Sequence, residues 1–205
     1  RDLKRKQPVP YGAYIRADGQ DVLCLSPELF LQRNGNTIVT RPMKGTASRG
    51  RTLEEDRLVS TWLTSDEKSR AENIMIVDLL RNDVGKVAEL DSVRVRDLFS
   101  VERHPTLFQM TSTVEGTLSP GMSYSDVLRS LFPCGSVTGA PKIRSMQIIH
   151  ELETGCRGIY TGTIGYFSPR EEAMFNVAIR TLVIRGNSGE MGVGSGIVSD
   201  SVPDD

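Results

Sequence analysis

The sequence lacks the features that mark several common classes of protein. Among its 205 residues, no apolar stretch approaches the roughly 18 residues that a membrane-spanning helix needs, and the start has no signal-peptide core. Cys24, Cys134 and Cys156 are far apart, which argues against a disulfide framework or a zinc site. The 25 basic and 26 acidic residues leave a net charge of −1 and hence no field that would attract nucleic acid. We therefore expect a cytoplasmic protein with no nucleic-acid or membrane partner.

The length and the ends of the chain suggest how it is organised. A chain of 205 residues can form one sizeable core or two small ones, and one domain over residues 1–205 is the simpler expectation. The sequence begins without Met and stops at Val202-Pro203-Asp204-Asp205, with no helix or obvious terminus behind it. We therefore expect a fragment that lacks an amino-terminal portion and the carboxyl-terminal end.

Alternating apolar and polar residues predict strands towards both ends of the chain. Residues 11–17 and 21–26 alternate around Asp18-Gly19, and residues 29–33 and 37–41 repeat the pattern around Asn34-Gly35-Asn36. These patterns are typical of β-hairpins, so four antiparallel strands are expected before residue 42. Further strands are expected at residues 93–97, 108–114, 158–167, 174–184 and 191–199.

Helices are expected between these groups of strands. Thr52 followed by Glu55 is the signature of a capping box, which predicts a helix from residue 53 to about 63. A second helix over residues 66–82 carries Ile74, Val77 and Leu80 at helical spacing. Shorter helices are expected within residues 121–132 and from Pro141 through Leu152 to a stop at Gly155. The order of strands, helices and strands favours an α+β protein with mainly antiparallel sheet over a parallel, doubly wound fold.

Lys44 is the first candidate for chemistry. It lies in Arg41-Pro42-Met43-Lys44-Gly45-Thr46, directly after an expected strand, and Glu28 lies sixteen positions upstream at the mouth of the second hairpin. A single lysine is more often a solvated surface residue, because its ammonium group prefers water. Without other signals, a surface position remains the simpler interpretation of Lys44.

Two glycine-bearing segments could receive a ligand. Residues 135–142 form a loop that leads into a helix with Pro141 in its first position, where free N–H groups and the helix dipole favour a carboxylate or phosphate. A simple turn with a helix cap is equally compatible with that loop. Gly192, Gly194 and Gly196 alternate within an expected strand, so either a ligand approaches the backbone there or the strand has a bulge or a sheet crossing.

Three further residues have both a functional and a structural interpretation. Arg180 lies in an apolar strand pattern, and if it faces inward it needs an anionic partner such as a carboxylate. Tyr160 could offer its hydroxyl to a ligand or simply pack. Glu72, close to the expected buried face of the second helix, could be an ion-pair partner, an exposed residue or a ligand for magnesium, which prefers oxygen.

Six motifs follow one another along the chain: Ser26-Pro27-Glu28, Arg41-Pro42-Met43-Lys44-Gly45-Thr46, Arg70-Ala71-Glu72-Asn73-Ile74-Met75-Ile76-Val77-Asp78-Leu79, Arg81-Asn82-Asp83, Thr138-Gly139-Ala140-Pro141-Lys142 and Gly194-Ser195-Gly196-Ile197-Val198. Together and in this order they resemble the chorismate-binding domain shared by anthranilate synthase, aminodeoxychorismate synthase and isochorismate synthases. In this family, lysine at the position of Lys44 is typical of component I of aminodeoxychorismate synthase, whereas anthranilate synthases typically carry alanine. The resemblance therefore implies p-aminobenzoate and folate synthesis.

The resemblance also implies a fold and a division of roles. The fold would be a sandwich of mainly antiparallel sheets flanked by helices. Arg180, Tyr160, Thr138 and the backbone of Gly194-Ser195-Gly196 would hold the chorismate carboxylates, and Glu72 would bind Mg²⁺. Lys44 would add to the ring and expel the 4-hydroxyl, with Glu28 as general acid. A glutamine amidotransferase, as a subunit or a fused domain, would supply ammonia.

The sequence departs from the family pattern at three places. Gln109 stands where many members have histidine, and Ser69 stands three residues before Glu72 where many have an acid. The family pattern continues after Asp200-Ser201-Val202-Pro203 to a second magnesium-binding glutamate, and this chain ends before it. The 205-residue form is therefore expected to turn over little, if at all. The alternatives are anthranilate synthase component I and a chorismate-binding fragment without catalysis.

Overall fold

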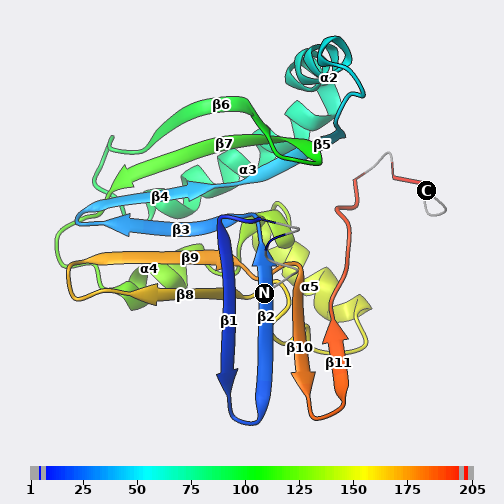
Figure 1. Cartoon of the computed structure of the whole chain (residues 1–205). Helices are drawn as coiled ribbons and strands as arrows, with labels where there is room; N and C mark the ends of the chain where they lie inside the picture. The colour runs from blue at the N-terminus through cyan, green and yellow to red at the C-terminus, as the bar shows by residue number, and fades with distance from the viewer. Residues whose placement is uncertain (1–4, 6–7, 199–200, 203–205) are drawn as a thin grey trace.

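Two antiparallel β-sheets form the framework of the protein (Figure 1). The computed structural model describes residue 5, residues 8–198 and residues 201–202. Over these residues, the four-stranded sheet has the order β1 (Tyr11–Ala17), β2 (Gln20–Ser26), β10 (Thr181–Arg185) and β11 (Ser188–Met191). The seven-stranded sheet has the order β5 (Met43–Ser48), β7 (Leu107–Thr117), β4 (Thr37–Arg41), β3 (Leu29–Asn34), β9 (Glu172–Val177) and β8 (Thr163–Phe167), and β6 (Arg94–Arg103) pairs with β7. The predicted α+β class and both predicted hairpins are confirmed.

The helices begin at the capping residues that the sequence indicates. In α2 (Leu53–Ser65), Thr52 Oγ1 accepts a hydrogen bond from Glu55 N–H at 3.1 Å. In α4 (Tyr124–Leu131), Ser123 and Asp126 form a complete capping box. The other helices are α3 (Glu67–Gly85), the 3₁₀ turn η1 (Gly135–Val137) and α5 (Lys142–Leu152), for which Pro141 is the N-cap and not the first helical residue. None of the described helices is long and apolar enough to cross a membrane.

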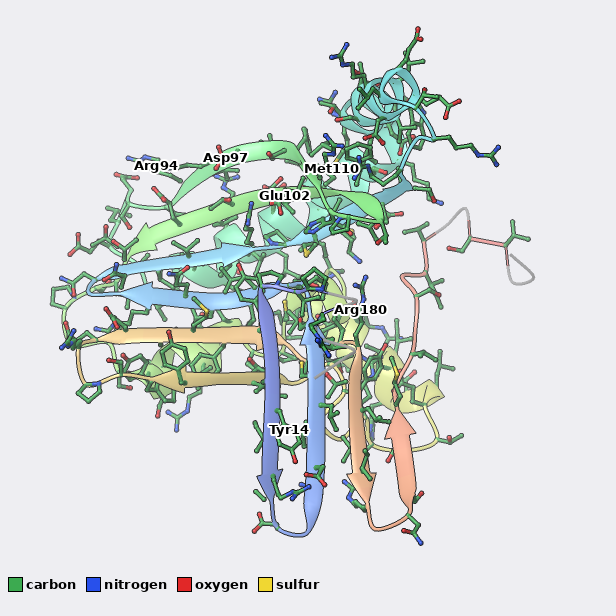
Figure 2. All side chains as sticks on the ribbon, in the orientation of Figure 1. Tyr14, Arg94, Asp97, Glu102, Met110 and Arg180 are labelled. Atoms are coloured by element: carbon green, nitrogen blue, oxygen red, sulfur yellow. The ribbon has the colours of Figure 1, made fainter. Side chains whose placement is uncertain are left out.

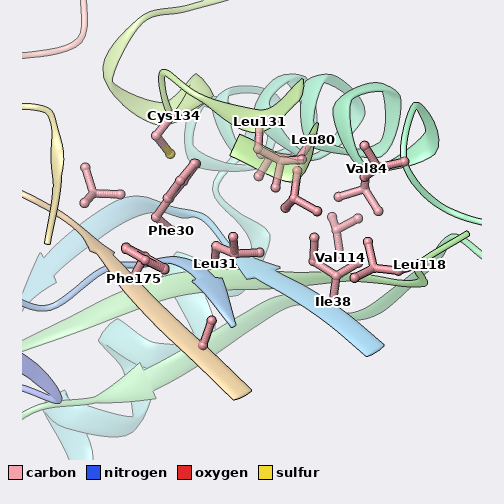
Figure 3. Packing of buried hydrophobic residues seen from close by; sticks show 14 of the residues in the cluster. Phe30, Leu31, Ile38, Leu80, Val84, Val114, Leu118, Leu131, Cys134 and Phe175 are labelled. Atoms are coloured by element: carbon pink, nitrogen blue, oxygen red, sulfur yellow. The ribbon is translucent and has the colours of Figure 1, made fainter. Parts of the chain in front are cut away.

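The main core lies between the seven-stranded sheet and helices α3 and α4 (Figure 3). The sheet contributes Phe30, Leu31, Ile38, Val114 and Phe175, and the helices contribute Ile76, Val77, Leu80, Val84, Val127 and Leu131. Ile74, predicted to lie on the buried face of α3, is 37% exposed, whereas Ile76 is 1% exposed. The apolar run in α3 is nearly continuous, so spacing alone does not identify its buried face. The polar Asn73 takes part of that face, and its Oδ1 accepts a hydrogen bond from Ser112 Oγ at 2.5 Å.

The chain crosses between the sheets at two adjacent places, and one crossing corrects a predicted strand. The expected strand over residues 174–184 is two strands, β9 in the larger sheet and β10 in the smaller one. Its apolar pattern is continuous because both halves face buried surfaces. The crossing from β2 to β3 runs alongside, and Leu25 N–H donates to Arg180 O at 3.0 Å while Val177 N–H donates to Glu28 O at 3.1 Å.

Two other predicted strands are shorter in the structure. The strand predicted over residues 158–167 begins at Thr163, after turns at residues 158–162. The strand predicted over residues 191–199 ends at Met191, and residues 192–198 have no regular structure, while Ser199 lies outside the described residues. Strand β11 is the edge strand of its sheet, and no described strand pairs with its outer side. All of its residues are exposed.

Candidate active site

Glu28 is a buried acid at the crossing from β2 to β3. Only 5% of the residue is exposed, and Oε1 has no hydrogen-bond partner among the described residues. Burial raises the pKa of Glu28 to about 7, although the Ser136 hydroxyl, the positive charge of Lys44 and the Met43 N–H each act in the opposite direction. A carboxyl group with such a pKa can donate a proton near neutral pH.

Lys44 lies on β5, close enough for its charge to act on Glu28. Its Nζ is also 3.6 Å from the position that a Cβ atom would occupy at Gly196. Lys44 itself is only partly buried. The structure thus brings the partly exposed Lys44 close to the buried carboxyl group of Glu28, sixteen positions earlier in the sequence.

The glycine-rich segment after β11 covers Tyr160. A Cβ atom at Gly192 would lie 2.3 Å from Tyr160 Cγ, and one at Gly194 would lie 3.0 Å from the Tyr160 hydroxyl. Ser195 is exposed between Gly194 and Gly196. The absent side chains therefore make room for Tyr160, and the segment leads from Tyr160 to Lys44. The predicted strand with a bulge or crossing is wrong for these residues, because no strand is present there.

The loop before α5 contributes two hydroxyl groups. Thr138 Oγ1 donates to Cys134 O at 3.0 Å, so this hydroxyl caps the 3₁₀ turn while its lone pairs remain available. The Ser136 hydroxyl lies against both Glu28 and Cys134, and the Ser136 Oγ to Cys134 Sγ distance is 3.2 Å. Thr138 is thus two residues along the chain from Ser136, whose hydroxyl contacts Glu28.

A buried ion pair fixes the end of this loop. Lys142 Nζ lies 2.5 Å from Asp83 Oδ2 and donates to Leu131 O at 2.8 Å. The Asp83 side chain is 2% exposed and the Lys142 side chain is 12% exposed. The pair joins α3 to the first residue of α5, and the bond to Leu131 adds the end of α4. Two sequence motifs, Arg81-Asn82-Asp83 and Thr138-Gly139-Ala140-Pro141-Lys142, thus meet in one structural contact.

Arg180 lies at the junction of the two sheets (Figure 2). The prediction that it lies within a strand is wrong: it is exposed, has φ of 51°, and belongs to the crossing between β9 and β10. Its side chain lines a pocket together with Pro27, Met43 and Gln109. Among the described residues, its guanidinium group has no ion-pair partner, so it can receive an anion.

Glu72 lies on α3 and is half-buried. Its carboxylate forms no ion pair or hydrogen bond with any described residue, and no cluster of three or more His, Cys, Asp or Glu side chains occurs in the described part of the chain. Magnesium commonly takes only one or two protein carboxylates and keeps water or substrate oxygens as its other ligands. Glu72 therefore fits the role of a single magnesium ligand.

Sequence patterns do not reveal the part that three residues play near this site. Ser136 lies within the glycine-bearing loop, but nothing in its sequence position indicates that it faces Glu28. Gln109 is notable in the sequence only as a departure from the family pattern. In the structure, both the nitrogen and the oxygen of its side-chain amide form hydrogen bonds with β5. Lys142 belongs to a family motif, and only the folded chain places it against Asp83.

Comparisons with known proteins identify the family. The model of the chorismate binding enzymes matches residues 1–205. Aminodeoxychorismate synthase component 1 of Bacillus subtilis is 43% identical over 203 residues, which cover 99% of this chain and 43% of that protein. Anthranilate synthase component 1 of Aquifex aeolicus is 46% identical over 204 residues, which cover 100% of this chain and 41% of that protein. The chain thus spans about two fifths of the length of these relatives.

Solved structures agree with this assignment. Anthranilate synthase component I of Streptococcus pneumoniae superposes with a TM-score of 0.86 at 36% identity, over 98% of this chain and 44% of that one. The menaquinone-specific isochorismate synthase of Escherichia coli superposes with a TM-score of 0.85 at 25% identity, over 94% of this chain and 44% of that one. The family predicted from six motifs is confirmed, and this chain belongs to the chorismate binding enzymes.

Proposed function

We propose that this chain is the chorismate-binding catalytic part of an aminodeoxychorismate synthase component I. The observation that carries the proposal is Lys44 beside Glu28, an amine next to a carboxyl group whose pKa is raised to about 7. Covalent catalysis needs a nucleophile, and departure of a hydroxyl group needs a proton donor. These two side chains supply both, and the protein would act in p-aminobenzoate and folate synthesis in the cytoplasm.

The proposed reaction has two displacement steps. Lys44 first gives up a proton to solvent, its free amine attacks ring C2 of chorismate, the ring double bonds shift, and the 4-hydroxyl leaves as water with the proton of Glu28. Ammonia then attacks C4, the double bonds shift back, and Lys44 is released from C2. The Glu28 carboxylate takes up the proton that the new ammonium group loses. The sum is chorismate and ammonia giving 4-amino-4-deoxychorismate and water.

The remaining residues would hold the dicarboxylate. Arg180 has the planar fork that suits a carboxylate, and Tyr160, Thr138 and the backbone of Gly194-Ser195-Gly196 would donate hydrogen bonds. Magnesium bound at Glu72 would neutralise a substrate carboxylate. A glutamine amidotransferase partner would supply the ammonia.

Intact mass spectrometry tests the lysine adduct. The full-length protein that carries this chain is incubated with chorismate and Mg²⁺ but without ammonia, and an adduct of chorismate less water is expected. Lys44→Ala should abolish it, and Lys68→Ala, which alters an exposed lysine at the start of α3, is the matched control. An adduct of the same mass in Lys44→Ala would refute the proposal.

Anthranilate synthase is the second candidate, because relatives of that activity are as similar as the aminodeoxychorismate synthases. Chorismate, Mg²⁺ and ammonium given to the full-length protein decide between them. Fluorescent anthranilate would favour the second candidate, whereas a product that a lyase converts to p-aminobenzoate supports the first. Titration calorimetry with chorismate and Mg²⁺ tests the third possibility, a fragment that binds without turnover.

A further inference from the structure

Strand β5 is irregular at Lys44. Met43 pairs with Thr111 of β7, and Thr46 pairs with Gln109. The step from Met43 to Thr46 takes three positions along β5, whereas the step from Thr111 to Gln109 takes two along β7. One extra residue on a strand is the definition of a β-bulge, which bends the strand and changes the direction of its side chains. The bulge consists of Lys44 and Gly45.

The side chain of Gln109 fills the gap that this bulge leaves in the ladder. Gln109 Nε2 donates to Gly45 O at 2.8 Å, and Gln109 Oε1 accepts from Thr46 Oγ1 at 3.0 Å. Only 7% of Gln109 is exposed. The orientation of the amide is fixed by chemistry, because the Gly45 carbonyl oxygen can only accept and must therefore face the NH₂ group.

Helix α3 closes the bulge from another side. Gly45 has φ of +87°, a conformation that suits glycine, and a Cβ atom on it would lie 2.7 Å from Ser69 Cβ. The peptide next to Lys44 is thus held between the Gln109 amide and the first turn of α3. The Lys44 side chain leaves this support towards Glu28 and Gly196.

We propose that Gln109 is a positioning residue for Lys44: its amide replaces the missing ladder contacts and holds the bulge so that the Lys44 amine stays beside Glu28. The inference rests on the proposed function for its catalytic meaning, since there Lys44 is the nucleophile. Loss of the amide releases Gly45 O and Thr46 Oγ1 together, and the bulge can then relax into another register. Displacing a reacting group by about 1 Å is enough to lower a rate about a hundredfold.

The test separates the position of Lys44 from its chemistry. The full-length protein is prepared with Gln109→Met, which keeps the side-chain length without either hydrogen bond, and with Gln147→Met, an exposed glutamine, as control. Without substrate, an amine-reactive reagent labels Lys44 and the exposed Lys68, and peptide mapping gives the ratio of their rates. We expect Gln109→Met to change that ratio at least about threefold and to lower kcat about a hundredfold with little change in KM. Gln147→Met should change neither.

Each failure has its own signature. An unchanged labelling ratio in folded Gln109→Met would overturn the inference, even where the chorismate adduct forms. If the labelling ratio changes in Gln109→Met but the unsubstituted protein forms no chorismate adduct, the proposed function is overturned and the positioning role still stands. If Gln109→Met does not fold, Thr46→Val removes one of the two contacts, and an unchanged labelling ratio in that variant would equally contradict the inference.

Discussion

Gly45→Ala should destabilise the protein more than any ordinary glycine substitution, because two effects add. A side chain at φ of +87° is strained, which costs about 1–3 kcal/mol. The new Cβ atom would lie 2.7 Å from Ser69 Cβ and 2.9 Å from Ser69 Oγ, and overpacking of this kind costs about 1–3 kcal/mol more. We therefore expect a loss of about 4 kcal/mol in the free energy of unfolding, measured by urea denaturation.

Two other glycines separate the effects. Gly19 has φ of +73°, and no atom lies within 4 Å of the position that its Cβ atom would occupy, so Gly19→Ala should show the backbone effect alone, about 1–2 kcal/mol. Gly85, at the end of α3, has neither a positive φ nor a close neighbour, so Gly85→Ala should be neutral or slightly stabilising. A loss for Gly45→Ala no larger than that for Gly19→Ala would refute the argument that Ser69 confines the bulge.

Three further predictions follow from buried or crowded groups. Because burial raises the pKa of Glu28 to about 7, the folded state keeps a proton that the unfolded chain releases, and the free energy of unfolding should fall by up to about 3 kcal/mol as the pH rises from about 4.5 to about 7. Glu28→Gln should remove this pH dependence of the free energy of unfolding, measured by urea denaturation at each pH. An unchanged pH dependence in the variant would contradict the burial of the Glu28 carboxyl group. Lys142→Met should destabilise the protein by about 2 kcal/mol, since it removes one of two lysine partners of the buried Asp83 while Lys86 Nζ stays 2.9 Å from Asp83 Oδ1, and a double-mutant cycle with Asp83→Asn should show coupling. Gly192→Ala should displace the Tyr160 ring and raise the chorismate dissociation constant about tenfold in calorimetry, with little change in the urea midpoint, because residues 193–197 beyond it are exposed and have no regular structure.

The sequence predicts the local elements of this fold better than their meeting points. The Asp18-Gly19 turn and the Thr52 cap are local signals, because the residues that form the turn or the cap are neighbours in the chain. The crossing at Arg180 is different, since an apolar pattern does not record that its two halves join different sheets. Ile74 shows the same limit within a helix, where a run of apolar residues offers more than one face.

The candidate site can be predicted as residue types and not as geometry. The family motifs point to Lys44, Glu28 and Glu72, and their chemistry is inferred from their side chains. The closeness of Lys44 to Glu28 depends on the bulge in β5, and no spacing of residues in the sequence predicts this bulge. The contacts of Ser136 and Gln109 at this site depend on strand register and loop closure, so they follow only from the folded chain.

The two crossings place the candidate site where the chain passes between the two sheets. Glu28 belongs to one crossing and Arg180 to the other, and backbone hydrogen bonds link the two crossings at Leu25 and Val177. Any rocking of one sheet against the other must bend the chain at these residues, which changes the separation of the proposed proton donor and the proposed carboxylate receptor. A ligand that contacts both Glu28 and Arg180 would hold the two crossings together, and hydrogen exchange at the Leu25 and Val177 amides should then slow when it binds.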